Sequence, residues 1–390
     1  LAGMEALIAA SLVLEAPRWE GERRFAMLET VREFGLERLA EGGEDEAVRD
    51  AHARYIVERV DAFRHGIEGP KRATASTGMI RDLDNVRAAL AWTVSHRDGE
   101  RARRIAGPLG PFWMDRGLMR EGRTWIERAL AIPGSSPIIT PEAHYWAGAL
   151  ALFQGDLDDA ESHAEAGLAR SRDAGNRFGE GGAVFILGLV AEARGDLHQA
   201  ATLQGSALRL LQTVAEQPWR NRLDAVVNQN LGVLALQRGD LAAARGHFEE
   251  SFAVWRGGGH PWGMARSLEA LANLALREGD APRALGLYAD ALERNAALHD
   301  TFHTAWDLLG MGEALLAAGS ADDATRLLGA AARVFREMEY VMSVSERAGA
   351  DAVRVRARAA LGEERFAAAW EAGGVLWLDE AVTEALALAR

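Results

Sequence analysis

The chain has 390 residues, of which 48% are hydrophobic and 26% charged, and its formal net charge is −13. It contains no cysteine, which excludes disulfides, thiol nucleophiles and cysteine-ligated metal centres. Lys71 is the only lysine, and Arg72 follows it. The Gly-Lys-Ser/Thr loop that holds phosphates in P-loop nucleoside triphosphatases is therefore absent.

The first residues show neither a signal peptide nor a membrane span. Glu5 precedes the apolar stretch at 7–14, where a signal peptide would carry Lys or Arg. No run along the chain reaches the roughly 18 to 20 apolar residues that cross a bilayer. Since cysteine is absent as well, we predict a cytoplasmic protein without a membrane partner.

Short helical and strand patterns share the first forty residues. The predicted order is a helix at 6–10, strands at 12–14 and 24–27 around a turn at 17–22, and a helix at 30–40. This is the order of the closing half of a winged-helix module. We predict that residues 1–41 are the C-terminal part of a winged helix. Residues 42–98 are predicted to be linker or capping helices, at 45–65 and 81–95.

A repeated turn organises the rest of the chain. It begins at five glycines spaced by 40, 44, 40 and 40 residues, namely Gly155, Gly195, Gly239, Gly279 and Gly319. A glycine can end a helix in the left-handed conformation, and the Asp that follows the first four can cap the next helix. Five residues after each glycine stands an alanine, which permits a close helix crossing. Each unit is therefore predicted to be helix, tight turn, helix and loop.

These units resemble the tetratricopeptide repeat. Leu187-Gly188, Ala200 and Ala207 fit its pattern, as do Leu231-Gly232, Ala244, Phe248 and Ser251. The resemblance implies an all-α, right-handed superhelix of helix pairs. We expect about six repeats over 99–338, with a period of about 40 residues, and a degenerate repeat or cap over 339–390. Pro108 and Pro111 should kink the first helix of the earliest unit.

Four further segments resemble one class of large bacterial regulators. Residues 24–40 are similar to the junction between the winged helix and the repeats in signal-transduction ATPases with tetratricopeptide-like repeats. Residues 82–92 and 121–130 resemble the next segments of the same family, and 366–386 resembles a tail found in LuxR-type members. The resemblance implies that this chain is the sensor and interaction region of a transcriptional regulator. It also implies that the ATPase domain, a partner of this region, and a helix-turn-helix lie outside the chain.

No pattern of catalytic, metal-binding or cofactor-binding residues stands out. His299 and His303 are spaced for a shared metal, but cap and surface roles explain them better. The glycine-rich stretch at 175–182 follows no strand and is expected to be a loop between repeats. Arginine clusters at 101–104 and 354–358 are expected on solvated faces, and the net charge opposes direct nucleic-acid binding. We predict no enzymatic activity, cofactor or metal.

The concave groove is the remaining candidate site. In stacked helix pairs the first helix of each unit lines the concave wall. Its inward positions carry Tyr145, Phe185, Glu192, Gln229, Glu269, Asn273, Trp306 and Glu313. Core packing would explain the aromatic members. It explains the polar members less well, because burying polar groups without hydrogen-bond partners is energetically costly. An acidic, amide-rich groove suits a basic or hydroxyl-rich small effector, or a peptide.

Two hypotheses from different classes follow. In the first, a protein, peptide or small effector bound in the groove changes the curvature of the superhelix and so controls an ATPase and DNA-binding part. In the second, the repeats are a structural scaffold for self-association or autoinhibition and bind no small molecule. An enzymatic role is a remote third.

Overall fold

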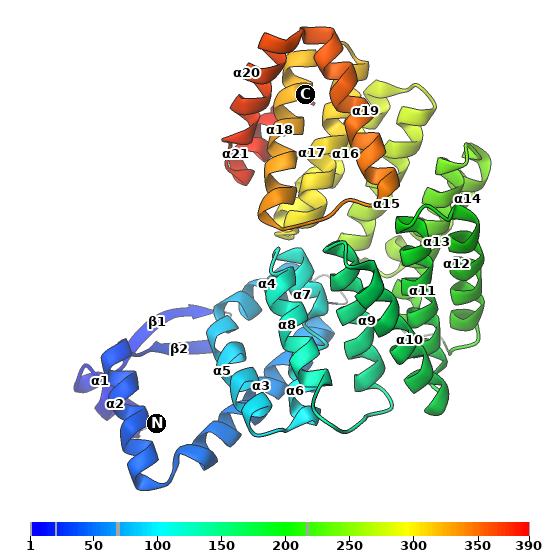
Figure 1. Cartoon of the computed structure of the whole chain (residues 1–390). Helices are drawn as coiled ribbons and strands as arrows, with labels where there is room; N and C mark the ends of the chain where they lie inside the picture. Colours follow the sequence, from blue (N-terminus) through cyan, green and yellow to red (C-terminus); the bar gives the residue numbers. More distant parts are fainter. Residues whose placement is uncertain (1, 20–21, 68–70, 216–217, 390) are drawn as a thin grey trace.

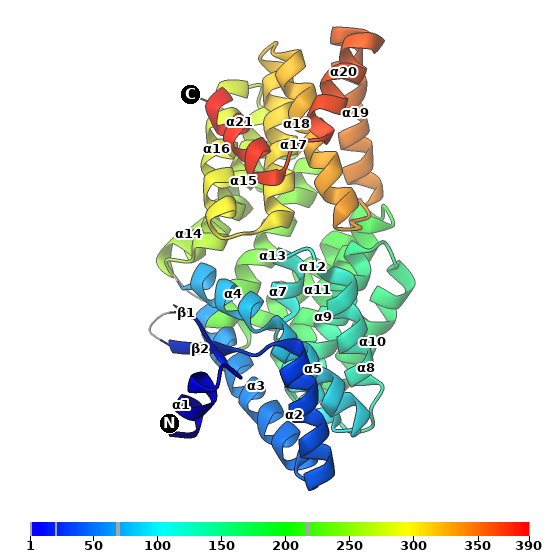
Figure 2. The ribbon, with the colours of Figure 1, turned by 90° about the vertical axis from the view of Figure 1, so that its left-hand side faces the viewer.

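The computed structural model describes residues 2–19, 22–67, 71–215 and 218–389. Its elements form an N-terminal hairpin with two helices, followed by stacked helices (Figure 1). The N-terminal and linker elements are α1 (Ala2–Ala9), β1 (Leu14–Trp19), β2 (Glu22–Ala26), α2 (Glu29–Gly42), α3 (Asp45–Ile67), α4 (Arg72–Arg81) and α5 (Leu83–Ser95). In Figures 1 and 2 the hairpin and α2 lie at the opposite end of the molecule from the C-terminal helices.

The strands pair antiparallel, with Leu14 opposite Ala26. The predicted strand limits and turn at 17–22 were wrong, because β1 runs through Pro17 to Trp19 and β2 begins at Glu22. Residues 20 and 21 of the predicted turn lie outside the described residues. An edge strand tolerates proline, and the pairing is irregular between Ala16 and Trp19.

Between residues 45 and 95 three helices replace the two expected. The region that precedes 81 forms α4, a separate helix. Asp82 separates α4 from α5 and is 5% exposed. Its carboxylate accepts from Arg24 of β2 at 2.6 Å and from Arg59 of α3 at 3.1 Å. The buried carboxylate therefore ties the hairpin to the helices.

The earliest repeat unit is kinked as predicted. Its helices are α6 (Gly99–Ala106), α7 (Gly110–Asp115) and α8 (Met119–Leu130). The break between α6 and α7 includes Pro108, whose ring and missing N–H interrupt a helix. A Cβ at Gly110 would collide with the indole of Trp146, so α7 and the next helix approach closely.

Five regular helix pairs follow. They are α9 (Ile139–Phe153) with α10 (Leu157–Asp173), α11 (Arg177–Ala193) with α12 (Leu197–Gln212), α13 (Pro218–Gln237) with α14 (Leu241–Gly257), α15 (Pro261–Arg277) with α16 (Ala281–Ala297), and α17 (Thr301–Ala317) with α18 (Ala321–Glu337). The chain ends in α19 (Val344–Leu361), α20 (Glu363–Gly374) and α21 (Leu378–Leu388). The predicted all-α superhelix of tetratricopeptide-like pairs is confirmed.

The turns within the pairs have the predicted geometry. All five glycines have positive φ, from 78° at Gly155 to 93° at Gly319. Asp156, Asp196, Asp240 and Asp280 each accept a backbone N–H three residues on, as N-caps do. The last turn has Ser320 in this place, and its side chain makes no cap hydrogen bond.

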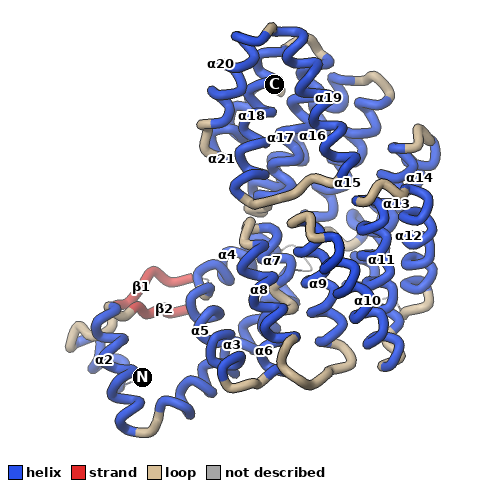
Figure 3. Tube along the Cα trace, viewed as in Figure 1, coloured by secondary structure: helices blue, strands red, loops and turns tan. Residues whose placement is uncertain are grey.

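The superhelix closes on itself through the segment between α18 and α19. In Figure 3 this tan segment runs above α7 and α9. The Val341 N–H donates to the Phe153 carbonyl at the end of α9, at 2.9 Å. Arg120 of α8 pairs with Glu339 at 2.5 Å. We call residues 338–343 the closing segment, because they join the last regular repeat to the first.

A buried ionic cluster forms a second closing contact. Arg72 of α4 pairs with Asp115 of α7, and both side chains are 3% exposed. The Arg72 guanidinium also lies over the Trp262 ring of α15, 5.1 Å from its centroid. Trp262 donates to Asp300, at the start of α17, at 2.9 Å. Helices near the N-terminus thus contact those of the fourth and fifth pairs.

None of the helices in the described ranges combines the length and apolarity that a membrane crossing requires. One buried apolar cluster runs from Ala53 in α3 through the repeats to Ala385 in α21. Buried apolar residues of α19 and α20 form a separate cluster with Leu328 of α18.

Candidate ligand-binding cavity

A cavity of about 760 Å³ lies inside the closed superhelix. The first helices of all five regular pairs line it, together with the closing segment and α19. Its size is within the range of 300 to 1,000 Å³ that is usual for small-ligand sites. All eight predicted groove residues line this cavity: Tyr145, Phe185, Glu192, Gln229, Glu269, Asn273, Trp306 and Glu313.

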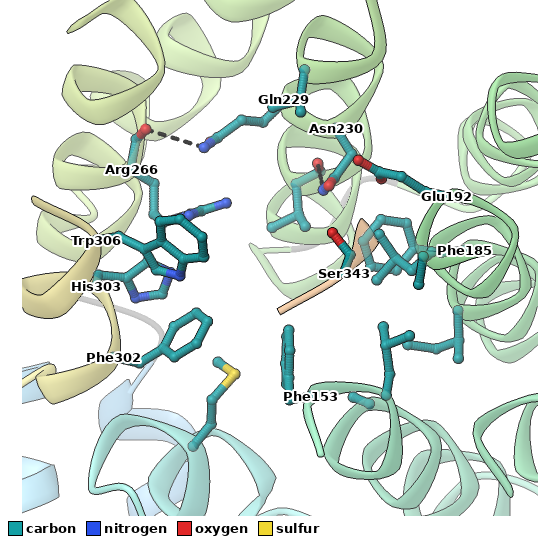
Figure 4. Close-up of a pocket in the computed structure, with 18 of the residues that line it drawn as sticks. Phe153, Phe185, Glu192, Gln229, Asn230, Arg266, Phe302, His303, Trp306 and Ser343 are labelled. Carbon is teal, nitrogen blue, oxygen red and sulfur yellow. Dashed lines mark hydrogen bonds between the residues drawn. The ribbon is translucent and has the colours of Figure 1, made fainter. Parts of the chain in front are cut away.

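Aromatic rings form one wall, at the closing segment (Figure 4). The Tyr340 ring lies 5.1 Å from Phe302, 6.1 Å from Phe153 and 6.0 Å from Trp306, between centroids. Phe153 and Phe302 are themselves 5.3 Å apart. This cluster joins α9, α17 and the closing segment, and it offers ring faces to an apolar or cationic group.

Amide and ionic contacts form the wall at α13 and α15. Gln229 donates through Nε2 to the Arg266 carbonyl at 3.1 Å, and Asn273 donates to the Glu269 carbonyl at 3.1 Å. The Glu269 carboxylate lies 3.4 Å from the Arg266 guanidinium. The backbone therefore holds both amide side chains, and their oxygens remain acceptors for other groups.

Glu192 of α11 is an unusual carboxylate. Its Oε1 accepts a hydrogen bond from Gln237 at 3.1 Å. Burial, and then the charge of Glu346 on α19, raise the pKa of Glu192 to about 7. A carboxyl group with this pKa holds a proton for part of the time near neutral pH.

The other acids of the cavity are neutralised. Glu313 pairs with Arg356 of α19 at 2.6 Å, and Glu142 pairs with Arg64 of α3 at 3.1 Å. Tyr145 stays protonated, because burial raises its pKa to about 12. Among the described acidic residues of the cavity, Glu192 and Glu346 are therefore the two that are not paired with an arginine.

Sequence patterns missed several lining residues. Phe153, Phe302, Tyr340 and Ser343 stand at helix ends or in the closing segment, outside the helical positions that face a groove. Only the folding back of the closing segment brings Tyr340 to the cavity. The proximity of Phe153 to Tyr340 follows from contacts between distant units, which a repeat pattern does not encode.

Two expectations for polar residues were wrong. His303 is 3% exposed, and its Nδ1 lies 2.6 Å from Asp300 Oδ2, so it has no surface role. Arg103 is 2% exposed and donates to the carbonyls of Ala129 and Ile132, both at 3.0 Å. In each case a buried partner replaces water. Among the described residues, no three His, Cys, Asp or Glu side chains are grouped to hold a metal ion.

Comparison with known sequences gives partial matches to regulators. No protein-family model matches the chain. A provisionally named HTH-type transcriptional regulator of Mycobacterium tuberculosis (strain ATCC 25618 / H37Rv) is 33% identical over 127 residues. The match covers 32% of this chain and 14% of that protein, and a Mycobacterium bovis counterpart matches to the same extent. The aligned stretch thus spans about a seventh of these relatives.

Solved structures show the same type of fold. A Rap protein complexed with competence and sporulation factor aligns with a TM-score of 0.50 and 14% identity, over 81% of this chain and 99% of that one. A signal-transduction ATPase with a tetratricopeptide repeat sensor, from Pyrococcus horikoshii, covers 98% of this chain and 59% of its own length, with a TM-score of 0.48 and 14% identity. The chain is a tetratricopeptide-like repeat protein. The matches to the HTH-type regulator and to the Rap protein agree with the prediction that the chain is not an enzyme.

Proposed function

We propose that this chain is the effector-binding sensor region of a cytoplasmic transcriptional regulator of the signal-transduction ATPase, LuxR-type class. The observation that carries the proposal is the cavity, which eight groove residues from five successive units line together. The partial match to HTH-type regulators supports the regulatory context. In the full protein, residues 1–41 would complete a winged helix next to an ATPase domain.

The bound molecule would be a short peptide or small effector. It would contact the repeats and the closing segment at once, because both line the cavity. A ligand shifts a conformational equilibrium only through a difference in its affinity for the two states. An effector that bridges α11 and the closing segment has that difference, since opening the superhelix would remove part of its site.

Two glycines offer a matched test. Gly349 on α19 lines the cavity and Gly286 on α16 does not, and a Cβ at either would meet no atom within 4 Å. We expect wild-type protein and Gly286→Trp to retain members of a random hexapeptide library through gel filtration, with detection by mass spectrometry. Gly349→Trp should lose them, because its indole would occupy part of the cavity. Equal retention by both variants, or none by the wild type, would contradict the proposal.

A structural scaffold is the second candidate, and the N-terminal surface favours it. None of the α2 side chains is buried. Leu14, Leu28 and Phe34 are 50%, 56% and 59% exposed. Exposed apolar groups of this kind are typical of a protein contact. Light scattering on the chain with and without residues 1–41 tests this candidate, since a scaffold should lose self-association with that segment.

A further inference from the structure

Glu192 and Glu346 both line the cavity, and among the described residues neither carboxylate is paired with an arginine or histidine. Glu346 accepts from Tyr340 Oη at 2.8 Å and from the Ser343 N–H at 2.7 Å. Glu192 accepts from the Gln237 amide. In the described part of the chain, every donor to either carboxylate is neutral, whereas Glu142, Glu269 and Glu313 each have an arginine.

An aromatic group stands beside this pair. Burial, and then the charges of Glu346 and Glu192, keep the pKa of the Tyr340 phenol well above the ordinary value. Tyr340 packs on Phe302 and Phe153 in the same wall. Figure 4 shows Glu192, Asn230 and Ser343 at one side of the open space and the rings of Phe302 and Phe153 below it. Two carboxylates and a ring cluster therefore adjoin one part of the cavity.

We propose that this part of the cavity binds a cationic group of the effector, an ammonium or guanidinium, between Glu192 and Glu346 and against the Tyr340 ring cluster. This inference rests on the proposed effector-binding function and names the chemistry of its ligand. A cation would offset the negative charge of two cavity carboxylates that have no cationic partner among the described residues. It would also gain from the ring faces, as cations do in aromatic sites.

The positions of Glu192 and Glu346 would allow the binding of a cation to favour the closed superhelix. Glu192 belongs to the second regular pair, while Glu346 caps α19 directly after the closing segment, through the Ser343 capping box. Without a cation, repulsion from Glu346 disfavours the ionised form of Glu192, so the pair provides no attraction between α11 and α19. A bound cation replaces this repulsion with attraction to both sides, so it favours the closed superhelix over an open one.

Two hexapeptide libraries test the inference on the full chain. The first has free N-terminal amines and contains lysine and arginine. The second is N-acetylated, with norleucine and citrulline in their places. We expect wild-type protein to retain the first library at least about tenfold more strongly than the second. Equal retention would overturn the cation site and leave the proposed function standing, whereas retention of neither would overturn both.

Two glutamine substitutions locate the effect. Glu192→Gln should abolish the preference for the cationic library over the neutral one. Glu161→Gln, which changes a carboxylate outside the cavity that is paired with Arg194, should keep the preference. An unchanged preference in Glu192→Gln would overturn the assignment. Thermal melting checks that both variants fold, and the comparison of libraries on the wild type decides the question if one does not.

Discussion

The turns within the repeats and the contacts that close the superhelix have different physical origins. Each turn is local: a glycine in the left-handed region and an exposed aspartate cap lie side by side in sequence. The closing cluster instead joins Arg72, Asp115 and Asp300, which are buried and far apart in the chain. A solenoid of local units is stable without closure. We therefore expect that the closing contacts determine the shape of the cavity and that the repeats fold without them.

Buried charge makes the closing cluster sensitive to change. Burial raises the pKa of Asp115 to about 6, although Arg72 opposes this shift. Asp300 has a lowered pKa, because the favourable charge and hydrogen bonds of His303 outweigh the effect of burial. A charge left without its partner in such a place is strongly destabilising. Substitution of single carboxylates in the turns and in the closing cluster can thus show how differently the two kinds of contact contribute to stability.

The largest effect is expected from Asp115→Ala. It leaves the guanidinium of Arg72 buried without its carboxylate, which should lower the free energy of unfolding by about 3–5 kcal/mol. Urea denaturation followed by circular dichroism measures this change. Asp158→Ala is the control, because the Asp158 side chain is 97% exposed in its pair with Arg194, and it should cost less than about 0.5 kcal/mol. Equal costs would contradict the account.

The next largest effect is expected from Glu192→Gln, whose effect on the free energy of unfolding should depend on pH. The native carboxyl has a pKa raised to about 7, so between about pH 4.5 and 7 the folded protein binds a proton that the unfolded chain has released. Stability should therefore fall as the pH rises through this window. Glu192→Gln removes that loss, and its free energy of unfolding at pH 8 should exceed that of the wild type by on the order of 1–2 kcal/mol.

Denaturation at two pH values tests this prediction. At pH 4 the two proteins should differ little, because the carboxyl is protonated in both states. Glu313→Gln should show no gain at pH 8, since Arg356 already balances its charge. A Glu192→Gln variant that is less stable than the wild type at pH 8 would mean that the carboxylate is not destabilising there.

The smallest effect is expected in a regular turn. Asp240→Ala removes the side-chain acceptor for the Ala243 N–H, and loss of an N-cap costs about 1 kcal/mol. Ser320, whose side chain makes no cap hydrogen bond, provides the comparison: Ser320→Ala should change stability by only a few tenths of a kcal/mol. Thermal melts of the two variants in parallel give the difference. Equal costs would show that the aspartate caps do not stabilise the turns.

The features that the sequence predicted are those with local causes. The five turns, the small alanine after each and the kink near Pro108 follow from residues within one unit. The groove positions also follow, since the eight predicted side chains face one cavity; whether they bind a ligand stays a prediction. By contrast, α4 and the return of Tyr340 to the cavity depend on partners in distant units. His303 and Arg103 have partners in or next to their own units, but the helical pattern does not show which polar side chains the packed helices cover.

Hydrogen exchange at the Val341 amide tests the closed superhelix most directly. This N–H donates to the Phe153 carbonyl across the closure, so it should exchange slowly in the wild-type protein although its segment is not helical. In Asp115→Ala the Val341 amide should exchange much faster, while amides within α11 and α12 keep their protection. Fast exchange at Val341 in the wild type would show that the two ends do not meet and that the cavity is an open groove.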